Sequence, residues 1–229
     1  PPAAPDDAFA TNARLLASVR NDDAGGIERA LRDGAAVNSR NRLGESALLI
    51  ALKKNRADFA QTLLAAGADV NEAAVNGVTP LMAAAGDGHI NEPTRGRVRT
   101  EDDALECYDL LRAAGADVNA RSTLSIADAD LKIWMPGNRT ALHAAASRGW
   151  DRLVKRLVAD GAELDVLDSN GLSAIDYALG RYPKDFNALA PESFPATVAL
   201  LRSLGATKEN PKATFPPGTT PRIQPLVPE

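Results

Sequence analysis

The dipeptide Gly-Ala recurs along this chain of 229 residues, each time in similar company. The flanking letters read DGAAVN, AAGADVN, AAGADVN, ADGAELD and SLGATKE, with the glycines at Gly34, Gly67, Gly115, Gly161 and Gly205. The first two of these glycines are 33 residues apart. A fixed period of this length predicts stacked supersecondary units instead of one globular core, and such a stack offers an extended surface for binding.

A second phrase lies upstream of four of these glycines. It reads ESALLIAL from Glu45, VTPLMAAA from Val78, RTALHAAA from Arg139 and LSAIDYAL from Leu172. The distance from its Ser or Thr to the next glycine is 21 residues in two units, Ser46–Gly67 and Thr140–Gly161. From Gly67 to Thr79 is 12 residues, so the two spacings together reproduce the period of 33.

The residue types in each unit predict two antiparallel helices. A Ser or Thr caps the free amides of a first helix, and Pro80 suits its first turn because that position needs no amide donor. A second helix follows, with apolar residues on one face. They are Phe59, Ala60 and Leu63, then Cys107, Tyr108 and Leu111, then Leu153, Val154 and Leu157. The glycine then ends that helix in a left-handed conformation.

These phrases resemble the ankyrin repeat, whose period is 33 and whose first helix opens with Thr-Pro-Leu-His-x-Ala. Thr79-Pro80-Leu81 and Thr140-Ala141-Leu142-His143 are its nearest copies. The resemblance implies an all-α solenoid of helix-turn-helix units with β-turn or hairpin fingers. It places His89 and His143 in structural roles. The expected repeats are 12–38, 39–71, 72–119, 133–165 and 166–207, between a flexible segment 1–11 and a proline-rich tail 208–229.

The period fails at three places, and insertions in repeat proteins map to loops that often carry function. The first reads HINEPTRGRVRTEDD and contains Arg95, Arg97 and Arg99, with Thr100 expected to cap the helix that follows. One interpretation is an arginine fork that binds a partner's carboxylates or phosphates. The alternative is a solvated loop whose arginines pair with the acids just after it.

The second insertion lengthens the finger over about residues 121–136 and reads TLSIADADLKIWMPGN around its centre. Its alternation predicts a small hairpin that carries Ile133, Trp134 and Met135. Aromatic residues and Met are enriched at interfaces, so these residues are candidate partner anchors, and the alternative is that they fold onto the core. The third insertion, GRYPKDFNALAPESFP, is expected to cover the end of the core in the last repeat.

Composition excludes several classes of function. The net charge is −4 with acids and bases mixed, so nothing predicts nucleic-acid binding, and the longest apolar run is far too short to span a bilayer. The single cysteine, Cys107, cannot form a disulfide within the chain. The two histidines and this cysteine are not spaced like the ligands of a metal site, so none is predicted. The sequence contains no cofactor-binding motif. We therefore expect that the protein is not an enzyme. The remote alternative is a catalytic site built between loops.

The two ends suggest a cellular location. The first residues, PPAAPDD, contain the Pro and Ala that often follow a cleaved export signal, so we expect a periplasmic or secreted protein, with the cytoplasm as the alternative. The last twenty residues hold six prolines and cannot be helical.

The sequence therefore predicts a non-enzymatic module that binds a protein partner in a hetero-complex. Its most specific form is an accessory or stabilising subunit of an exported bacterial enzyme, and the alternative is a secreted effector that binds a host protein. The candidate partner-binding residues lie on the fingers, the arginine loop and the end of a first helix. They are Arg40, Arg42, Leu43, Val75, Arg95, Arg97, Arg99, Ile133, Trp134, Met135, Arg148 and Trp150.

Overall fold

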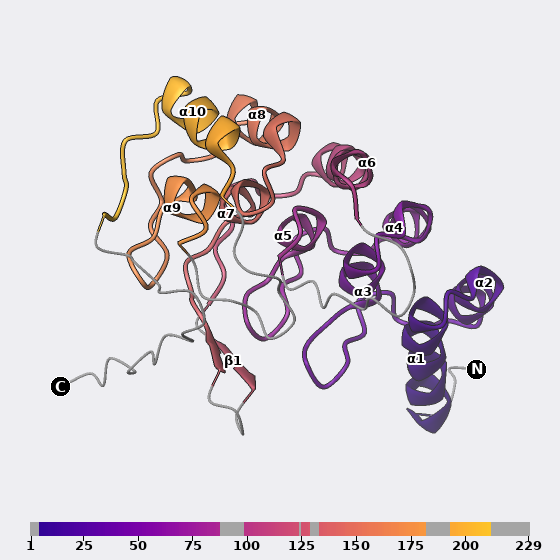
Figure 1. Cartoon of the computed structure of the whole chain (residues 1–229). Coiled ribbons are helices and arrows are strands. Elements are labelled where there is room, and N and C mark those ends of the chain that lie inside the picture. Colours follow the sequence, from indigo (N-terminus) through magenta and orange to yellow (C-terminus); the bar gives the residue numbers. More distant parts are fainter. Residues whose placement is uncertain (1–4, 88–98, 124, 129–132, 182–192, 212–229) are drawn as a thin grey trace.

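The computed structural model describes residues 5–87, 99–123, 125–128, 133–181 and 193–211. These residues form two rows of helices that run the length of the molecule (Figure 1). The inner row holds α1, α3, α5, α7 and α9, and each of these helices contacts the next in the row. The outer row holds α2, α4, α6, α8 and α10. This arrangement confirms the predicted all-α solenoid of paired helices.

The helices are short and come in antiparallel pairs. Their bounds are α1 Pro5–Arg20, α2 Ala24–Arg32, α3 Ala47–Lys53, α4 Ala57–Ala65, α5 Pro80–Ala84, α6 Glu101–Ala113, α7 Ala141–Ala146, α8 Asp151–Ala159, α9 Ala174–Ala178 and α10 Pro195–Ser203. We call the segment that joins one pair to the next a finger. The four fingers are residues 33–46, 66–79, 114–140 and 160–173, and the third contains the strands β1 Ser125–Asp128 and β2 Ile133–Met135.

The first helices begin at the predicted caps. The Ser46 hydroxyl accepts a hydrogen bond from the Leu49 amide at 3.3 Å, and the Thr79 hydroxyl accepts one from the Met82 amide at 3.3 Å. Pro80 occupies the first turn of α5. At the far end of the unit, Gly67 has a φ of +88° and open space where a Cβ would lie. Glycine is therefore required there by the backbone conformation and not by crowding.

The core lies between the two rows. All nine predicted second-helix residues are buried, including Leu63 of α4, Tyr108 of α6 and Leu157 of α8. Cys107 packs in this core as a free thiol. The outer helices are also joined by ion pairs, such as Arg152 of α8 with Glu101 of α6 at 2.8 Å. Burial of the apolar stripe is the main stabilising term, since most helical stability in proteins comes from packing.

Side chains of one residue type link successive units along an edge of the stack. The Oδ1 atom of Asn38 accepts from the Asp69 amide at 2.8 Å, and that of Asn71 accepts from the Asp117 amide at 2.8 Å. Asn119 repeats the contact with Glu163 at 2.9 Å. Each unit thus supplies the acceptor for a backbone donor in the next unit, which fixes the spacing of the repeats.

The beginning of the chain departs from the prediction. Helix α1 starts at Pro5, so residues 5–11 are helical where a flexible segment 1–11 was expected. Pro5 is followed by Asp6 and Asp7, and Pro and acidic residues favour the first turn of a helix. Thr11 and Leu15 of α1 are buried, so this longer first helix is packed onto the array.

Candidate protein-binding surface

The fingers form one continuous edge because backbone hydrogen bonds join them. The Val75 amide donates to the Leu43 carbonyl at 3.2 Å, which links the first two fingers. The Thr123 amide donates to the Asn76 carbonyl at 2.9 Å and links the second to the third. The Ser169 amide donates to the Gly137 carbonyl at 2.9 Å and links the third to the fourth. A partner that contacts one finger therefore meets a surface held in place by its neighbours.

Two large apolar side chains are exposed on neighbouring fingers of this edge. Leu43 is 61% exposed and Val75 is 71% exposed. Their backbones are joined, because the Val75 amide donates to the Leu43 carbonyl at 3.2 Å. Single exposed apolar residues are ordinary, but adjacent ones on a rigid edge are typical of binding surfaces. Phe9 on α1 is also exposed.

The third finger contains the predicted hairpin. Strands β1 and β2 pair antiparallel, with Ser125 opposite Met135 and Ile126 opposite Trp134, and the register shifts between Ile126 and Asp128. Figure 1 shows this hairpin extending beyond the helices on the side where the other fingers lie. The structure describes the backbone of Ile133, Trp134 and Met135, and the positions of their side chains stay outside the described part.

The predicted arginines of the first finger lie at the surface. Arg40 is exposed and forms an ion pair with Glu72 of the next finger. Its backbone makes an isolated bridge with Ser46. Arg42 is exposed beside Leu43. The first finger therefore presents a positive charge next to its apolar tip.

Three residues of the predicted binding set are not open surface. Arg99 is only 7% exposed, and its Nη1 donates to the Ala83 carbonyl at 2.7 Å. Arg148 is half-buried and donates from Nη2 to the Gly86 carbonyl at 3.0 Å. Trp150 is buried at the N-cap of α8, under the guanidinium of Arg148. Arg99 and Trp150 are therefore buried where exposed side chains were expected, and Arg148 is engaged between repeats.

The physical reason lies at the end of α5. This helix has no basic residue in its last turn, and its final carbonyls attract cations from other repeats. Arg99 is buried and not solvated, and two of the acids that follow it, Glu101 and Asp102, pair with Arg152 of α8. Arg95, Arg97 and His89 fall outside the described residues.

The predicted cap of the helix after the arginine loop is confirmed, since Thr100 and Asp103 form a capping box at the start of α6.

Several ionisable side chains near the inner helices are used to join repeats. Asp87 and Arg139 form an ion pair of 2.6 Å, with side chains only 3% and 10% exposed. His143 Nδ1 lies 2.9 Å from the Thr140 hydroxyl and its Nε2 lies 3.3 Å from the Leu172 carbonyl, which confirms the structural role expected for it. Burial lowers the pKa of His143 to about 4, so the ring is neutral at physiological pH.

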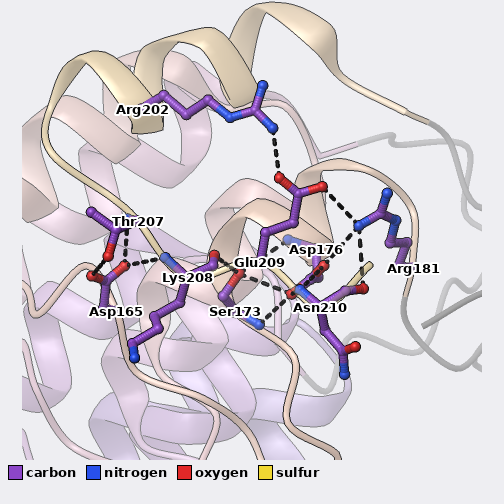
Figure 2. A network of polar contacts seen from close by, with 9 residues as sticks. All are labelled: Asp165, Ser173, Asp176, Arg181, Arg202, Thr207, Lys208, Glu209 and Asn210. Atoms are coloured by element: carbon purple, nitrogen blue, oxygen red, sulfur yellow. Dashed lines mark hydrogen bonds and ion pairs between the residues drawn. The ribbon is translucent and has the colours of Figure 1, made fainter. Parts of the chain in front are cut away.

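Sequence reasoning missed the network that closes the last repeat (Figure 2). We call residues 207–211 the strap. The Asp165 carboxylate accepts from the amides of Thr207 and Lys208 at 2.8 and 2.9 Å, in the manner of the asparagines along the stack. The strap then crosses to α9, where the Asp176 carboxylate accepts from the Asn210 amide at 3.0 Å. These bonds make residues 208–211 part of the repeat array and not of a separate tail.

Arginines complete this network. The Nη1 atom of Arg181 donates to Asp176 at 3.2 Å and to Glu209 at 3.0 Å. Arg202 of α10 pairs with the other oxygen of Glu209 at 2.6 Å. The spacing of Ser173 and Asp176 is that of a capping box, and this signal in the sequence would have identified Asp176 as a helix-capping residue.

The described residues show neither a metal-binding cluster nor a membrane span. Within them, no group of three or more His, Cys, Asp or Glu side chains is placed to hold a metal ion. No helix of that part is long and apolar enough to cross a membrane.

Family models for ankyrin repeats match three stretches that cover most of the chain. The one for three copies matches residues 15–92, the one for a single repeat matches 76–123, and the one for many copies matches 130–186. With the paired helices and the fingers, these matches define a repeat solenoid. The chain belongs to the ankyrin repeat proteins, whose arrays typically act by binding protein partners and not by catalysis.

The individual relatives are longer proteins, of which this chain matches only a part. The chain is 30% identical over 192 residues, 74% of its length, to the nuclear factor NF-kappa-B p105 subunit of Gallus gallus. It is 30% identical over 130 residues, 57% of its length, to the ankyrin repeat and KH domain-containing protein mask-1 of Caenorhabditis elegans, and 42% identical over 60 residues, 26% of its length, to a mitochondrial disaggregase of Bos taurus. The matches span 17%, 4% and 9% of these proteins.

Proposed function

We propose that this chain binds a folded protein partner through its finger edge, which consists of Arg42, Leu43, Val75 and the hairpin of β1 and β2. The pair of exposed apolar residues at the tips of the first two fingers carries this proposal. Backbone hydrogen bonds hold the tips in place before binding, so little conformational entropy is lost when a partner docks. The hairpin extends past these tips and offers a second contact for the same partner.

The more specific form of the proposal is an accessory or stabilising subunit of an exported enzyme. An array that joins its fingers edge to edge is a rigid support, which suits a protein that stabilises another protein. The location in the periplasm or outside the cell belongs to this proposal and is tested by fractionating the source cells and probing each fraction for the chain.

A pull-down from extract of the source cells tests the finger edge. The full chain is compared with the variant Leu43→Glu/Val75→Glu and with Trp134→Ala/Met135→Ala. We expect the first variant to weaken partner affinity about tenfold or more, because apolar anchors at an interface contribute upwards of ~1.4 kcal/mol each. Both changed residues are exposed, so the substitutions leave the core intact.

The matched control is Lys155→Glu, which places a new charge on the outer helix α8 at an exposed position. The control is expected to recover as much partner as the unchanged chain. Recovery of an exported enzyme supports the subunit, and recovery of no partner from this extract favours the effector. If the Leu43→Glu/Val75→Glu chain binds its partner as tightly as the unchanged chain, the finger edge is not the interface.

A further inference from the structure

Arg99 is a buried cation held at only one of its nitrogens. It directly precedes the capping residue Thr100 of α6, and its Nη1 donates to the Ala83 carbonyl near the end of α5 at 2.7 Å. Its Nε and Nη2 atoms are buried, and no described residue accepts a hydrogen bond from either. Buried polar groups are nearly always hydrogen-bonded, so these two donors need an explanation.

The two unpaired donors form one geometric unit. Nε and Nη2 point to the same side of the planar guanidinium and make a fork of two parallel N–H groups. Such a fork matches two oxygens of one carboxylate, sulfate or phosphate group in a bidentate pair. The hydrogen bond from Nη1 to the Ala83 carbonyl orients the guanidinium, and it uses neither of the two N–H groups of the fork.

The Cys107 thiol and the Asp103 carboxylate of α6 lie close enough to Arg99 to stabilise its cation. Burial lowers the pKa of its guanidinium to about 10, with the nearby charge of Arg148 acting in the same direction, so the group is still a cation at neutral pH. Burial raises the pKa of the neighbouring Cys107 thiol, which therefore stays protonated. The Asp103 carboxylate accepts from Thr100 in the capping box.

A second guanidinium lies at the same helix end. Arg148 donates to the Gly86 carbonyl, three residues after the carbonyl that Arg99 contacts. Its Nε would lie 2.2 Å from a Cβ at position 86, so the absence of a side chain at Gly86 admits it. The charge of Arg148 acts on the Arg99 guanidinium, and a buried cation such as Arg99 favours a nearby anion.

From this geometry we propose that the fork of Arg99 is an oxyanion-binding site. Its ligand is a group with two oxygens for the Nε and Nη2 donors, provided by a free inorganic oxyanion or by a side-chain carboxylate of the protein partner. Arg148 adds positive charge without giving up its contact with Gly86. This site is separate from the finger edge and does not depend on the function proposed for that edge.

The test observes the arginine Nε–H signals of the full chain by ¹H–¹⁵N NMR spectroscopy. Sodium sulfate, sodium phosphate and sodium acetate are titrated separately, with sodium chloride used to hold the ionic strength constant. The Arg99 signal is assigned by its loss in Arg99→Lys, which keeps the charge but removes the fork. We expect a saturable shift of this signal, and an affinity for the anion at least about tenfold lower in Arg99→Lys by calorimetry, the effect of one lost charge-assisted bond.

Arg121→Lys is the matched control, because Arg121 is exposed and pairs with Glu163 across the next finger. This variant is expected to bind the anion as the unchanged chain does. A shift with sulfate or phosphate alone identifies a free oxyanion as the ligand, and a shift with acetate identifies a carboxylate. Circular dichroism verifies that Arg99→Lys is folded. The proposal is overturned if none of the three anions gives a saturable shift of the Arg99 signal.

Discussion

Replacing Asp87 with alanine is expected to lower the free energy of unfolding by about 3–5 kcal/mol, the usual effect of removing one partner of a buried ion pair. The variant keeps the Arg139 cation in a site where its side chain is only 10% exposed and removes the carboxylate 2.6 Å away. The two residues belong to adjacent repeats, so the loss also weakens the contact between those repeats. Urea denaturation followed by circular dichroism measures the effect.

A double variant separates the pair from the packing around it. Asp87→Ala/Arg139→Met removes both charges and is expected to be more stable than Asp87→Ala alone, because no buried charge remains uncompensated. Asp109→Ala is the control, since it breaks an ion pair with Arg156 in which both side chains are half-exposed, and should change stability by less than about 1 kcal/mol. Equal effects of Asp87→Ala and Asp109→Ala would contradict this account of the buried pair.

Replacing Asp176 with alanine is expected to release the strap and to cost about 3 kcal/mol, since hydrogen bonds to charged groups contribute about 1.5–3 kcal/mol. The Asp176 carboxylate is fully buried and accepts from Ser173, Arg181 and Asn210. Without it, the cap of α9 and the anchor of the strap are lost together. Hydrogen exchange at the Asn210 amide and urea denaturation measure the two effects.

Glu209→Gln is the matched control for Asp176→Ala. It removes the ion pairs of Glu209 with Arg181 and Arg202 at the edge of the strap but leaves the buried carboxylate in place. We expect a loss of less than about 1 kcal/mol and continued protection of the Asn210 amide. If the Asn210 amide exchanges equally slowly in Asp176→Ala and the unchanged chain, then Asp176 does not anchor the strap.

The repeating parts of the fold were predictable because each physical requirement recurs at a fixed interval. Caps such as Ser46, the buried stripes of the second helices and left-handed glycines such as Gly67 repeat with the period of 33. The sequence needed no long-range information to place them, since each unit contacts mainly its neighbours. The hairpin in the third finger was also predictable, because strand alternation is a local signal.

The parts that the sequence did not predict depend on particular neighbours. The start of α1 was missed because the register of later repeats was imposed on the first, although Pro5 followed by acidic residues is itself a signal for a helix start. The burial of Arg99 follows from the carbonyls at the end of α5, which belong to an earlier part of the chain. A cluster of arginines in a loop indicates charge but not whether another helix end will cover it.

The candidate binding surface was predictable only in part. Leu43 and Val75 were identified from their place on the fingers, and the structure shows both exposed. The sequence could not show whether Trp150 is a core residue or an interface residue. An aromatic side chain suits both packing at the start of α8 and contact with a partner. The strap network was missed because it joins the segment after α10 to residues more than 30 positions earlier.

Site-specific photocrosslinking tests the central claim most directly. A benzophenone side chain is placed at position 75 on the finger edge or, as the control, at position 155 on the outer face of α8, and the chain is irradiated in extract of its source cells. We predict a single crosslinked partner from position 75 and none from position 155. A partner crosslinked from position 155 but not from position 75 would contradict the proposal that this ankyrin array binds through its fingers.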